Sequence, residues 1–235
     1  MEVKLIAVTR YEDGEDAPVQ LSAGQPGGQA ERLLERAGRL CYGSRMGDSG
    51  AFLHARVREG HLSLVEHATA SFYIGGISRA ASHQLVRHRL CSFSQRSQRY
   101  TSEKDARFVV PPSVAAHPEA ARVYAALLDH ARETYGKLIA LGIPREDSRF
   151  ALPTATATEL IMSFNFREAL HIFSLRITPA AQWEIREVCR RMLDQLHSVA
   201  PAVFGELRDN LRSAYPLFWN DLPRAGEGVT GIRTP

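Results

Sequence analysis

The stretch from Gln84 to Tyr100 carries the strongest binding chemistry of the chain, because cationic side chains are interleaved there with hydroxyl and amide groups. Its five cationic or imidazole side chains are Arg87, His88, Arg89, Arg96 and Arg99. Guanidinium groups match the geometry of phosphate oxygens, and the stretch contains no carboxylate that would repel an anion. These residues predict a site for a phosphate-bearing ligand. The alternative is a solvated basic loop, which is the commoner origin of an arginine-rich run.

A second polar group follows in the last third of the chain. The segment 165–175 has the composition of a helix that ends before the next proline, with Asn165 as its candidate cap and Arg176 just beyond its end. Arg167 and His171 are four residues apart, so a helix places them on one face. The pattern is compatible with a ligand site and also with an ordinary polar helix edge.

A third polar group, from His61 to His67, invites a metal-site interpretation because it contains two histidines and Glu66. A zinc-protease helix needs two histidines four residues apart, with a glutamate beside the first. The two histidines here are six residues apart, and the second one begins a predicted strand. We therefore expect no metal site, and a buried histidine pair with Glu66 as its partner is the structural alternative.

Length and composition indicate an ordinary globular protein. The 235 residues suffice for one large domain or two small ones, with 44% apolar and 23% charged residues. The net charge of +3 argues neither for nor against nucleic acid. Cys41, Cys91 and Cys189 form neither a disulfide framework nor a metal motif, which favours a reducing compartment. The start lacks signal-peptide anatomy, and no run reaches the roughly 18 apolar residues of a membrane span. We expect a cytoplasmic protein.

Hydrophobic periodicity predicts the elements that must position these groups. The expected strands are 3–9, 67–74 and 156–164, with a short extended piece at 108–110. The expected helices are 30–41, 51–58, 78–87, 119–141, 165–175 and 182–199. We expect Gly75-Gly76 to end the second strand, Ser78 to cap the third helix, and Leu127 to lie in the apolar stripe of the fourth. Few strands separated by helices indicate one α+β domain over residues 1–220, followed by a disordered tail at 221–235.

The three polar groups together match the motifs of a known family. The segment 87–97, which reads Arg-His-Arg, seven residues and Ser, resembles the signature of the flavin-dependent thymidylate synthases. The segment 165–176 resembles their second signature, and 61–67 matches the pattern His, four residues, Glu-His. The resemblance spans roughly residues 30–216. Many members carry glutamate at the position of Gln95, although glutamine is also common there. An amide can hydrogen-bond a ring or a hydroxyl, but it cannot act as a base. The resemblance implies an α+β fold with a mainly antiparallel central sheet flanked by helices.

The resemblance also implies two neighbouring ligands, the flavin dinucleotide FAD and the substrate deoxyuridine monophosphate (dUMP). Flavin contacts are expected at Ser63, Arg87, His88, Arg89, Gln95, Asn165, Phe166, Arg167 and His171. Substrate contacts are expected at Gln84, Leu85, Val86, Arg87, Gln95, Arg96, Ser97, Gln98, Arg99, Arg149 and Arg176. Arg176 is the expected catalytic residue, because its guanidinium would stabilise charge on the pyrimidine ring. His61 is expected near the flavin ring on the folate side.

The activity implied by the resemblance is the reductive methylation of dUMP to dTMP. FAD reduced by NADPH would supply electrons, 5,10-methylenetetrahydrofolate would supply the carbon, and tetrahydrofolate would be released. None of the three cysteines lies in an obviously activated setting for the alternative thiolate route. Ser97 has no adjacent base and orienting group, so we assign it to binding rather than covalent catalysis.

The resemblance further implies a homotetramer with active sites shared between subunits, and we expect neither a nucleic-acid nor a membrane partner. Two other function classes remain open at this point. A nucleic-acid-binding module would use the arginine-rich stretch, although Phe93 and Tyr100 are the only aromatic residues there that could stack on bases. A non-catalytic flavin or nucleotide carrier would use the same residues without chemistry.

Overall fold

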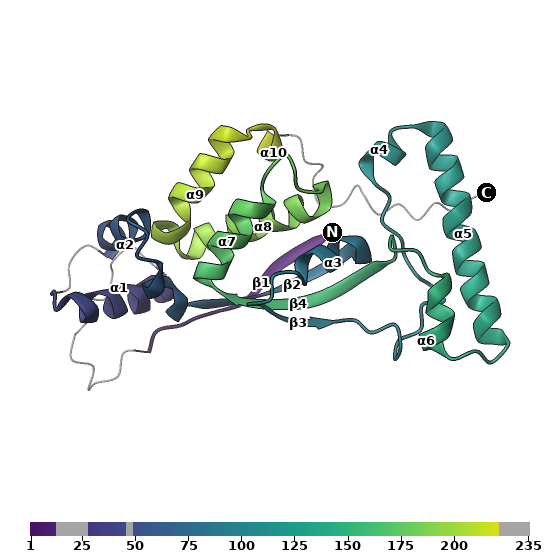
Figure 1. Cartoon of the computed structure of the whole chain (residues 1–235), viewed down its shortest axis with the longest axis horizontal. Helices are drawn as coiled ribbons and strands as arrows, with labels where there is room; N and C mark the ends of the chain where they lie inside the picture. The colour runs from purple at the N-terminus through teal and green to yellow at the C-terminus, as the bar shows by residue number, and fades with distance from the viewer. Residues whose placement is uncertain (13–27, 46–48, 221–235) are drawn as a thin grey trace.

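A four-stranded antiparallel sheet forms the centre of the molecule in the computed structural model, which describes residues 1–12, 28–45 and 49–220 (Figure 1). Its strands are β1 (Glu2–Val8), β2 (Thr69–Ser78), β3 (Ser92–Gln95) and β4 (Ala157–Asn165). They lie in the order β1-β2-β4-β3, so β1 and β3 form the two edges. This arrangement confirms the predicted α+β class with a mainly antiparallel sheet. The predicted disordered tail lies outside the described residues.

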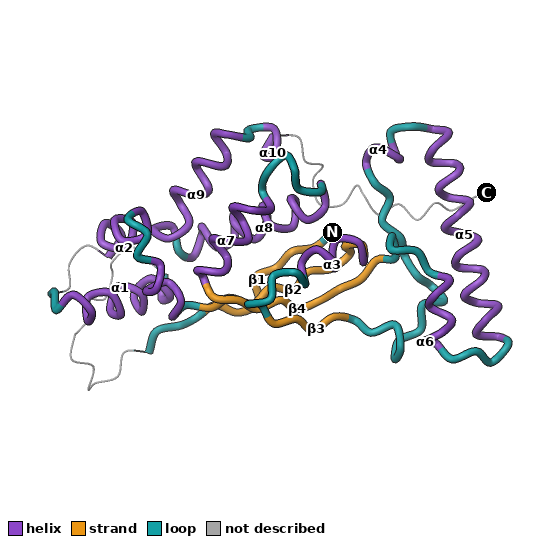
Figure 2. Tube along the Cα trace, viewed as in Figure 1, coloured by secondary structure: helices purple, strands orange, loops and turns teal. Residues whose placement is uncertain are grey.

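Helices cover one face of the sheet and extend beyond both of its ends (Figure 2). The α-helices are α1 (Gln29–Tyr42), α2 (Ser49–Arg58), α3 (Arg79–Leu85), α4 (Pro112–Ala115), α5 (Pro118–Ala140), α6 (Arg145–Ser148), α7 (Phe166–Arg176), α8 (Trp183–Val199), α9 (Pro201–Ala214) and α10 (Leu217–Asn220). Two 3₁₀ helices are η1 (Leu62–His67) and η2 (Arg149–Ala151). Helices α3, α7 and α8 lie against the sheet, whereas α1 and α2 lie beyond one end and α5 and α6 beyond the other (Figure 1).

The core lies between the sheet and α8. Alternation along β2 places Ala70, Phe72 and Ile74 on the helix-covered face, where each is at most 2% exposed. The inward face of α8 is the predicted one: Ile185, Val188, Cys189, Met192 and Leu196 are fully buried. Burying each large apolar side chain contributes about 1.5–3 kcal/mol to stability. The other face of the sheet carries more exposed side chains, including Ile161 at 43% exposure.

Several local expectations were wrong. β2 does not end at the glycine pair but continues to Ser78, with a register shift between Gly75 and Ile77 and a left-handed Gly76 (φ 67°). A bulge of this kind uses the conformational freedom of glycine without ending the strand. Leu127 is 54% exposed and lies outside the buried stripe of α5. β3 and α9 were not predicted at all.

The α3 region also differs from the expectation. Ser78 caps α3 as predicted, since its Oγ accepts a hydrogen bond from the Ala81 backbone N–H. The helix, however, ends at Leu85 rather than at Arg87, and a turn follows in which the His88 N–H donates to the Leu85 carbonyl. The orientation of the Arg87–Arg89 segment is therefore set by a turn and not by helical periodicity.

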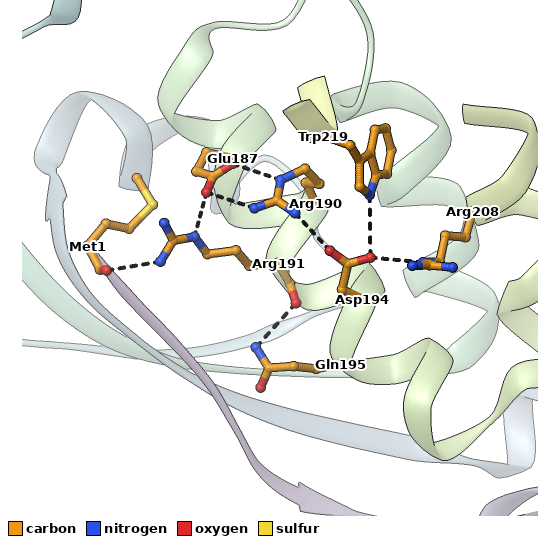
Figure 3. Close-up of polar contacts among 8 residues, drawn as sticks. All are labelled: Met1, Glu187, Arg190, Arg191, Asp194, Gln195, Arg208 and Trp219. Atoms are coloured by element: carbon orange, nitrogen blue, oxygen red, sulfur yellow. Dashed lines mark hydrogen bonds and ion pairs between the residues drawn. The ribbon is translucent and has the colours of Figure 1, made fainter. Parts of the chain in front are cut away.

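Polar side chains of α8 hold both ends of the described chain (Figure 3). The amide of Gln195 accepts a hydrogen bond from the Leu5 N–H at 2.8 Å and donates to the Val3 carbonyl at 2.9 Å. Asp194 accepts hydrogen bonds from Arg190 at 2.8 Å and Arg208 at 2.9 Å, and from the Trp219 indole at 3.4 Å. These contacts tie the edge strand β1, α9 and α10 to one helix.

Among the described residues, no helix is both long enough and apolar enough to cross a membrane. The same part of the chain contains no cluster of three or more histidine, cysteine or acidic side chains placed to hold a metal ion. All three cysteines are free thiols.

Candidate active site

An open pocket of about 810 Å³ lies where β4 passes into α7, close to η1. Its lining is Leu62, Glu66, Leu90, Asn165, Arg167, Glu168, Leu170, His171 and Ser174. Three leucines provide apolar surface beside six polar or charged side chains, and this combination suits a small molecule that carries both a ring and charged groups. Three of the residues predicted to contact a flavin, Asn165, Arg167 and His171, line this one pocket.

The start of α7 explains how these three side chains come together. Asn165 ends β4 and caps α7, because its Oδ1 accepts a hydrogen bond of 2.9 Å from the Glu168 N–H. Phe166 and Phe173 turn into the core, where both are fully buried, and this leaves Arg167 and His171 exposed on the pocket side. The sequence prediction that these two share one helix face is confirmed.

Arg167 also joins α7 to η1 through an ion pair with Glu66. Glu66 is therefore the partner of an arginine and not of the neighbouring histidines. His61 and His67 are both exposed, so the alternative of a buried histidine pair is wrong. The Nδ1 atom of His61 instead lies 3.0 Å from the Tyr42 hydroxyl.

A partly buried hydrogen bond joins a residue of the first signature to a residue of the second. Nε of Arg176 donates to Nε2 of His88 at 3.0 Å, and His88 is only 6% exposed. The His88 ring centroid lies 6.4 Å from that of His171, and its Nδ1 atom lies 3.7 Å from Oε1 of Glu168. Burial, with Arg176 and then His171 as further causes, lowers the pKa of His88 to about 4. The ring is therefore neutral at pH 7 and can accept the bond from Arg176.

Arg176 itself is positioned differently from the prediction. It is the last residue of α7 and not the first residue beyond it. The direction of its side chain is therefore set by the helix axis and by His88, rather than by an irregular segment before the proline. The neighbouring Ile177 is fully buried, which anchors the end of the helix.

Arg149 and the predicted substrate residues of segment 95–99 form a second group, around the loop that follows β3, whereas Gln84, Leu85, Val86 and Arg87 lie at the end of α3 and in the turn after it. Glu146 of α6 connects two residues of the second group, because its carboxylate pairs with Arg99 at 2.9 Å and its carbonyl accepts from Arg149 at 3.1 Å. Arg145 adds a hydrogen bond of 2.8 Å to the Tyr100 carbonyl. Two arginines separated by 50 positions in the numbering thus share one glutamate.

The side chains at the start of this loop are tied to the sheet. Nε2 of Gln95 donates to Ser82 at 3.0 Å and to Thr158 at 3.1 Å, so a ligand would meet its carbonyl oxygen. Arg96 lies 3.5 Å from Glu159 and 3.9 Å from Glu103. These carboxylates and Arg96 line a smaller pocket of about 430 Å³ on the open face of the sheet, together with Tyr73. A hydrogen bond to Glu159 is the main cause that raises the pKa of Tyr73 to about 12.

Two buried donors in this second group have no hydrogen-bond partner in the part of the chain that the structure describes. They are Nε2 of Gln98 and Nε of Arg79. Buried donors are normally satisfied, so these atoms mark positions at which a ligand could accept a hydrogen bond. Burial, followed by the nearby charges of Arg149 and Arg96, lowers the pKa of the Arg79 guanidinium, although Glu103 opposes the shift.

Not every predicted contact residue presents its side chain to a ligand. Leu85 and Phe166 are fully buried in the core, so only their backbones could reach one. Ser63, Arg87 and Arg89 are exposed. The described contacts include no hydrogen bond or ion pair between the pocket group around His171 and the loop group around Arg149. One chain therefore presents two separate parts of the predicted site.

Sequence reasoning missed several side chains that contact the predicted site residues. Among them are Tyr42, Arg79, Glu146 and Glu168. Glu168 lies inside the second signature, but at a position that the signature leaves open. Tyr42 and Glu146 come from α1 and α6, and nothing in the linear spacing connects them with the signatures.

These features define an α+β protein with a central antiparallel sheet, a pocket where β4 passes into α7 and two groups of cationic side chains. Within this class, the chain belongs to the thymidylate synthase complementing protein family, whose sequence profile matches residues 26–202. This match confirms the resemblance that the signatures indicated.

Relatives and a solved structure agree with this membership. The chain is 43% identical over 188 residues to a flavin-dependent thymidylate synthase of Geobacter sulfurreducens, covering 75% of this chain and 81% of the relative. It is 37% identical over 227 residues to one of Mycobacterium marinum, covering 88% and 89%. Its fold matches that of the UMP/dUMP methylase PolB from Streptomyces cacaoi, solved with 5-Br dUMP, with a TM-score of 0.72. That match covers 91% of this chain and 94% of the other at 21% identity, so it concerns the fold alone.

Proposed function

We propose that the protein is a flavin-dependent thymidylate synthase that methylates dUMP at C5. The overall reaction converts dUMP, 5,10-methylenetetrahydrofolate, NADPH and a proton into dTMP, tetrahydrofolate and NADP⁺. The observation that carries the proposal is the hydrogen bond between Arg176 and His88, because it unites two distant signatures beside one pocket. The names of the relatives and the dUMP analogue in the structural neighbour support the same activity.

The residues of the larger pocket fit a flavin dinucleotide. Arg167 and His171 offer positive or hydrogen-bonding groups to an anionic pyrophosphate, and Leu62 and Leu170 offer apolar surface to a flat ring. Because the Oδ1 atom of Asn165 is used by the helix cap, its amide N–H groups are the part available to a ligand. When bound, FAD supplies the electrons that it takes from NADPH.

The second group fits the nucleotide phosphate. Arg99 and Arg149 both contact Glu146. The Ser97 hydroxyl accepts a hydrogen bond of 3.2 Å from the backbone N–H of Arg99, and this bond orients the loop at Ser97. The unpartnered amide N–H₂ group of Gln98, in the described part of this loop, is a further donor. Two guanidinium groups, a hydroxyl and an amide form a donor set suited to a phosphate monoester.

Arg176 has the central role in the proposed chemistry. Carbon–carbon bond formation at C5 requires electron density in the pyrimidine ring, and this density can be stabilised as negative charge on the ring oxygen and N3. Nε of Arg176 is used in the hydrogen bond to His88. The two terminal NH₂ groups remain available, and together they can donate hydrogen bonds to the negative charge on the ring. Gln95 can orient the ring by hydrogen bonding but cannot remove a proton.

The arrangement in one chain supports a homotetramer with shared sites. The pocket group and the loop group are both bordered by exposed apolar side chains, with Leu90 80%, Tyr100 74% and Phe150 84% exposed. Large exposed apolar side chains beside polar groups are typical of subunit interfaces. We propose that the loop of one subunit faces the pocket of another and so completes the nucleotide site. Light scattering after size-exclusion chromatography tests the assembly.

Tritium release from C5-labelled dUMP tests the function directly. The purified protein should be yellow, should release FAD on denaturation, and should release tritium only when both NADPH and 5,10-methylenetetrahydrofolate are present. A carrier without catalytic activity would retain its ligand but release no tritium under any of these conditions. Salt-dependent binding to a polynucleotide, without tritium release, would instead support a nucleic-acid-binding protein.

A further inference from the structure

Glu168 and His88 form a buried pair that the signatures do not include. Each residue is 6% exposed, and Oε1 of Glu168 lies 3.7 Å from Nδ1 of His88. On the other side of the same ring, Nε2 accepts the hydrogen bond from Arg176. A nitrogen that accepts a hydrogen bond carries no proton, so the neutral ring must carry its proton on Nδ1. That is the atom that faces the carboxylate.

We propose that Glu168 is a positioning residue, which selects the Nδ1–H tautomer of His88 and thereby holds Arg176 in its working orientation. The inference rests on the proposed function, because it concerns the orientation of Arg176 toward a pyrimidine. The distance of 3.7 Å is longer than a direct hydrogen bond, so the carboxylate acts through its charge on the Nδ1–H dipole.

The opposite tautomer would break the link to Arg176. With the proton on Nε2, two N–H donors would face each other across the 3.0 Å that now separate His88 and Arg176. Neither donor would have an acceptor, and leaving donors unsatisfied inside a protein is unfavourable. The guanidinium would then lose the contact that fixes its Nε edge. Removing the partner that sets the tautomer of a metal-bound histidine typically changes metal affinity or activity by about 10- to 100-fold. For His88, which belongs to no metal-binding cluster among the described residues, we expect an effect at the lower end of this range.

The charges around the ring agree with this role for Glu168. The groups that face His88 are His171 and Arg176 on α7, and both oppose protonation of the ring. Cys91 lies in the same region, and burial raises its pKa to about 12, so it stays an uncharged thiol. Among the described groups around the ring, Glu168 is thus the source of negative charge.

The cap of α7 uses only the backbone of Glu168, so it does not explain why this position carries a carboxylate. The bond to the Asn165 cap comes from the backbone N–H of Glu168, which any residue except proline supplies. The nearby Arg167 pairs with Glu66 and does not depend on Glu168. Replacing the carboxylate by an amide of equal size therefore keeps the cap and removes only the charge.

The test compares Glu168→Gln with wild type in the full-length, flavin-loaded protein. Nitrogen-15 NMR of histidine-labelled protein identifies the tautomer, and His88→Gln assigns the His88 signal by its loss. We expect wild type to show the Nδ1–H tautomer from pH 5.5 to 8. We expect Glu168→Gln to show a tautomer mixture and a kcat per bound flavin about tenfold lower. Glu206→Gln is the matched control, because this exposed carboxylate also lies beside a histidine, 3.4 Å from His54.

Each result separates the two proposals. An Nε2–H tautomer of His88 in wild type overturns the inference, and this measurement does not require Glu168→Gln to fold. A Glu168→Gln protein with unchanged tautomer, or with a changed tautomer and full kcat, overturns it as well. If wild type releases no tritium from dUMP, the proposed function is rejected instead. The NMR measurement still decides whether His88 carries its proton on Nδ1, because it does not depend on activity.

Discussion

Nε of Arg176 donates a hydrogen bond of 3.0 Å to Nε2 of His88, and this bond joins the last residue of α7 to the turn after α3. The two residues are 88 positions apart in the sequence. Their contact links the second signature directly to the first. The site is therefore organised around a neutral imidazole that serves as an acceptor.

Replacing Arg176 by alanine should abolish most turnover while flavin binding persists. The change removes donors directed at developing charge, and such donors are typically worth about 100- to 1,000-fold in kcat. Tritium release and the flavin absorption spectrum measure the two properties separately. Arg176→Lys should recover little activity, because an ammonium lacks the fork and the Nε contact to His88. Arg122→Ala, on the exposed side of α5, is the matched control; retained activity in Arg176→Ala would contradict the assigned role.

Replacing His171 by alanine should weaken flavin retention more than it weakens dUMP binding. His171 lines the larger pocket, whereas the residues assigned to the phosphate lie in the loop group. Losing one hydrogen-bonding group of this kind costs about 1.4 kcal/mol, which is about tenfold in affinity. The ratio of flavin to protein absorbance after gel filtration measures the effect. Full retention in His171→Ala, with His130→Ala on α5 as reference, would argue against this pocket as the flavin site.

The low pKa of His88 should make stability depend on pH. In an unfolded chain a histidine has a pKa near 6.5, whereas folding lowers the pKa of His88 to about 4. Below pH 6.5 the unfolded state therefore binds a proton that the folded state does not, and stability falls as the pH drops toward 4. Between pH 8 and pH 5 this loss amounts to about 2 kcal/mol. Urea unfolding of wild type and His88→Gln should show it as a difference in pH dependence, and parallel profiles would refute it.

The Asp194 network should stabilise the C-terminal helices (Figure 3). Asp194→Ala removes the shared acceptor of Arg190, Arg208 and Trp219, and it leaves two guanidinium groups without this partner. A loss of about 2 kcal/mol corresponds to a fall of about 5 °C in Tm for a chain of this size. Calorimetry measures the shift, and faster proteolysis after α9 should accompany it. The exposed Asp209→Ala on the same helix pair should change Tm by less than about 1 °C.

The parts of the fold that were predicted correctly are those in which a periodic pattern coincides with burial. Alternation in β2 and the apolar stripe of α8 could be recognised because one face of each element enters the core. β3 was missed since it has only four residues and is mostly polar, and its pairing of Phe93 with Met162 is fixed by the distant β4. The prediction that β2 ends at Gly75-Gly76 was wrong because glycine also occurs in β-bulges, which bend a strand without ending it.

The site shows the same division between local and distant information. The signatures predicted that Arg167 and His171 share a helix face, since the spacing within one helix determines it. They did not predict that Glu66 pairs with Arg167 or that Glu168 faces His88, because these contacts depend on where α7 lies against other elements. Spacing therefore identified residues, whereas tertiary packing determined their partners.

The side chain of Gln195 has a consequence for how the protein is made. It fills hydrogen-bonding positions along the outer edge of β1, which precedes every other described element in the sequence. The strand that pairs with its inner edge, β2, begins at Thr69, but Gln195 follows Leu5 by 190 residues. All of these residues must be synthesised before the outer edge is covered. Until then a nascent chain exposes a strand that could pair with another copy. Cotranslational folding of this protein should therefore finish late, with the N-terminal strand among the last elements to be secured.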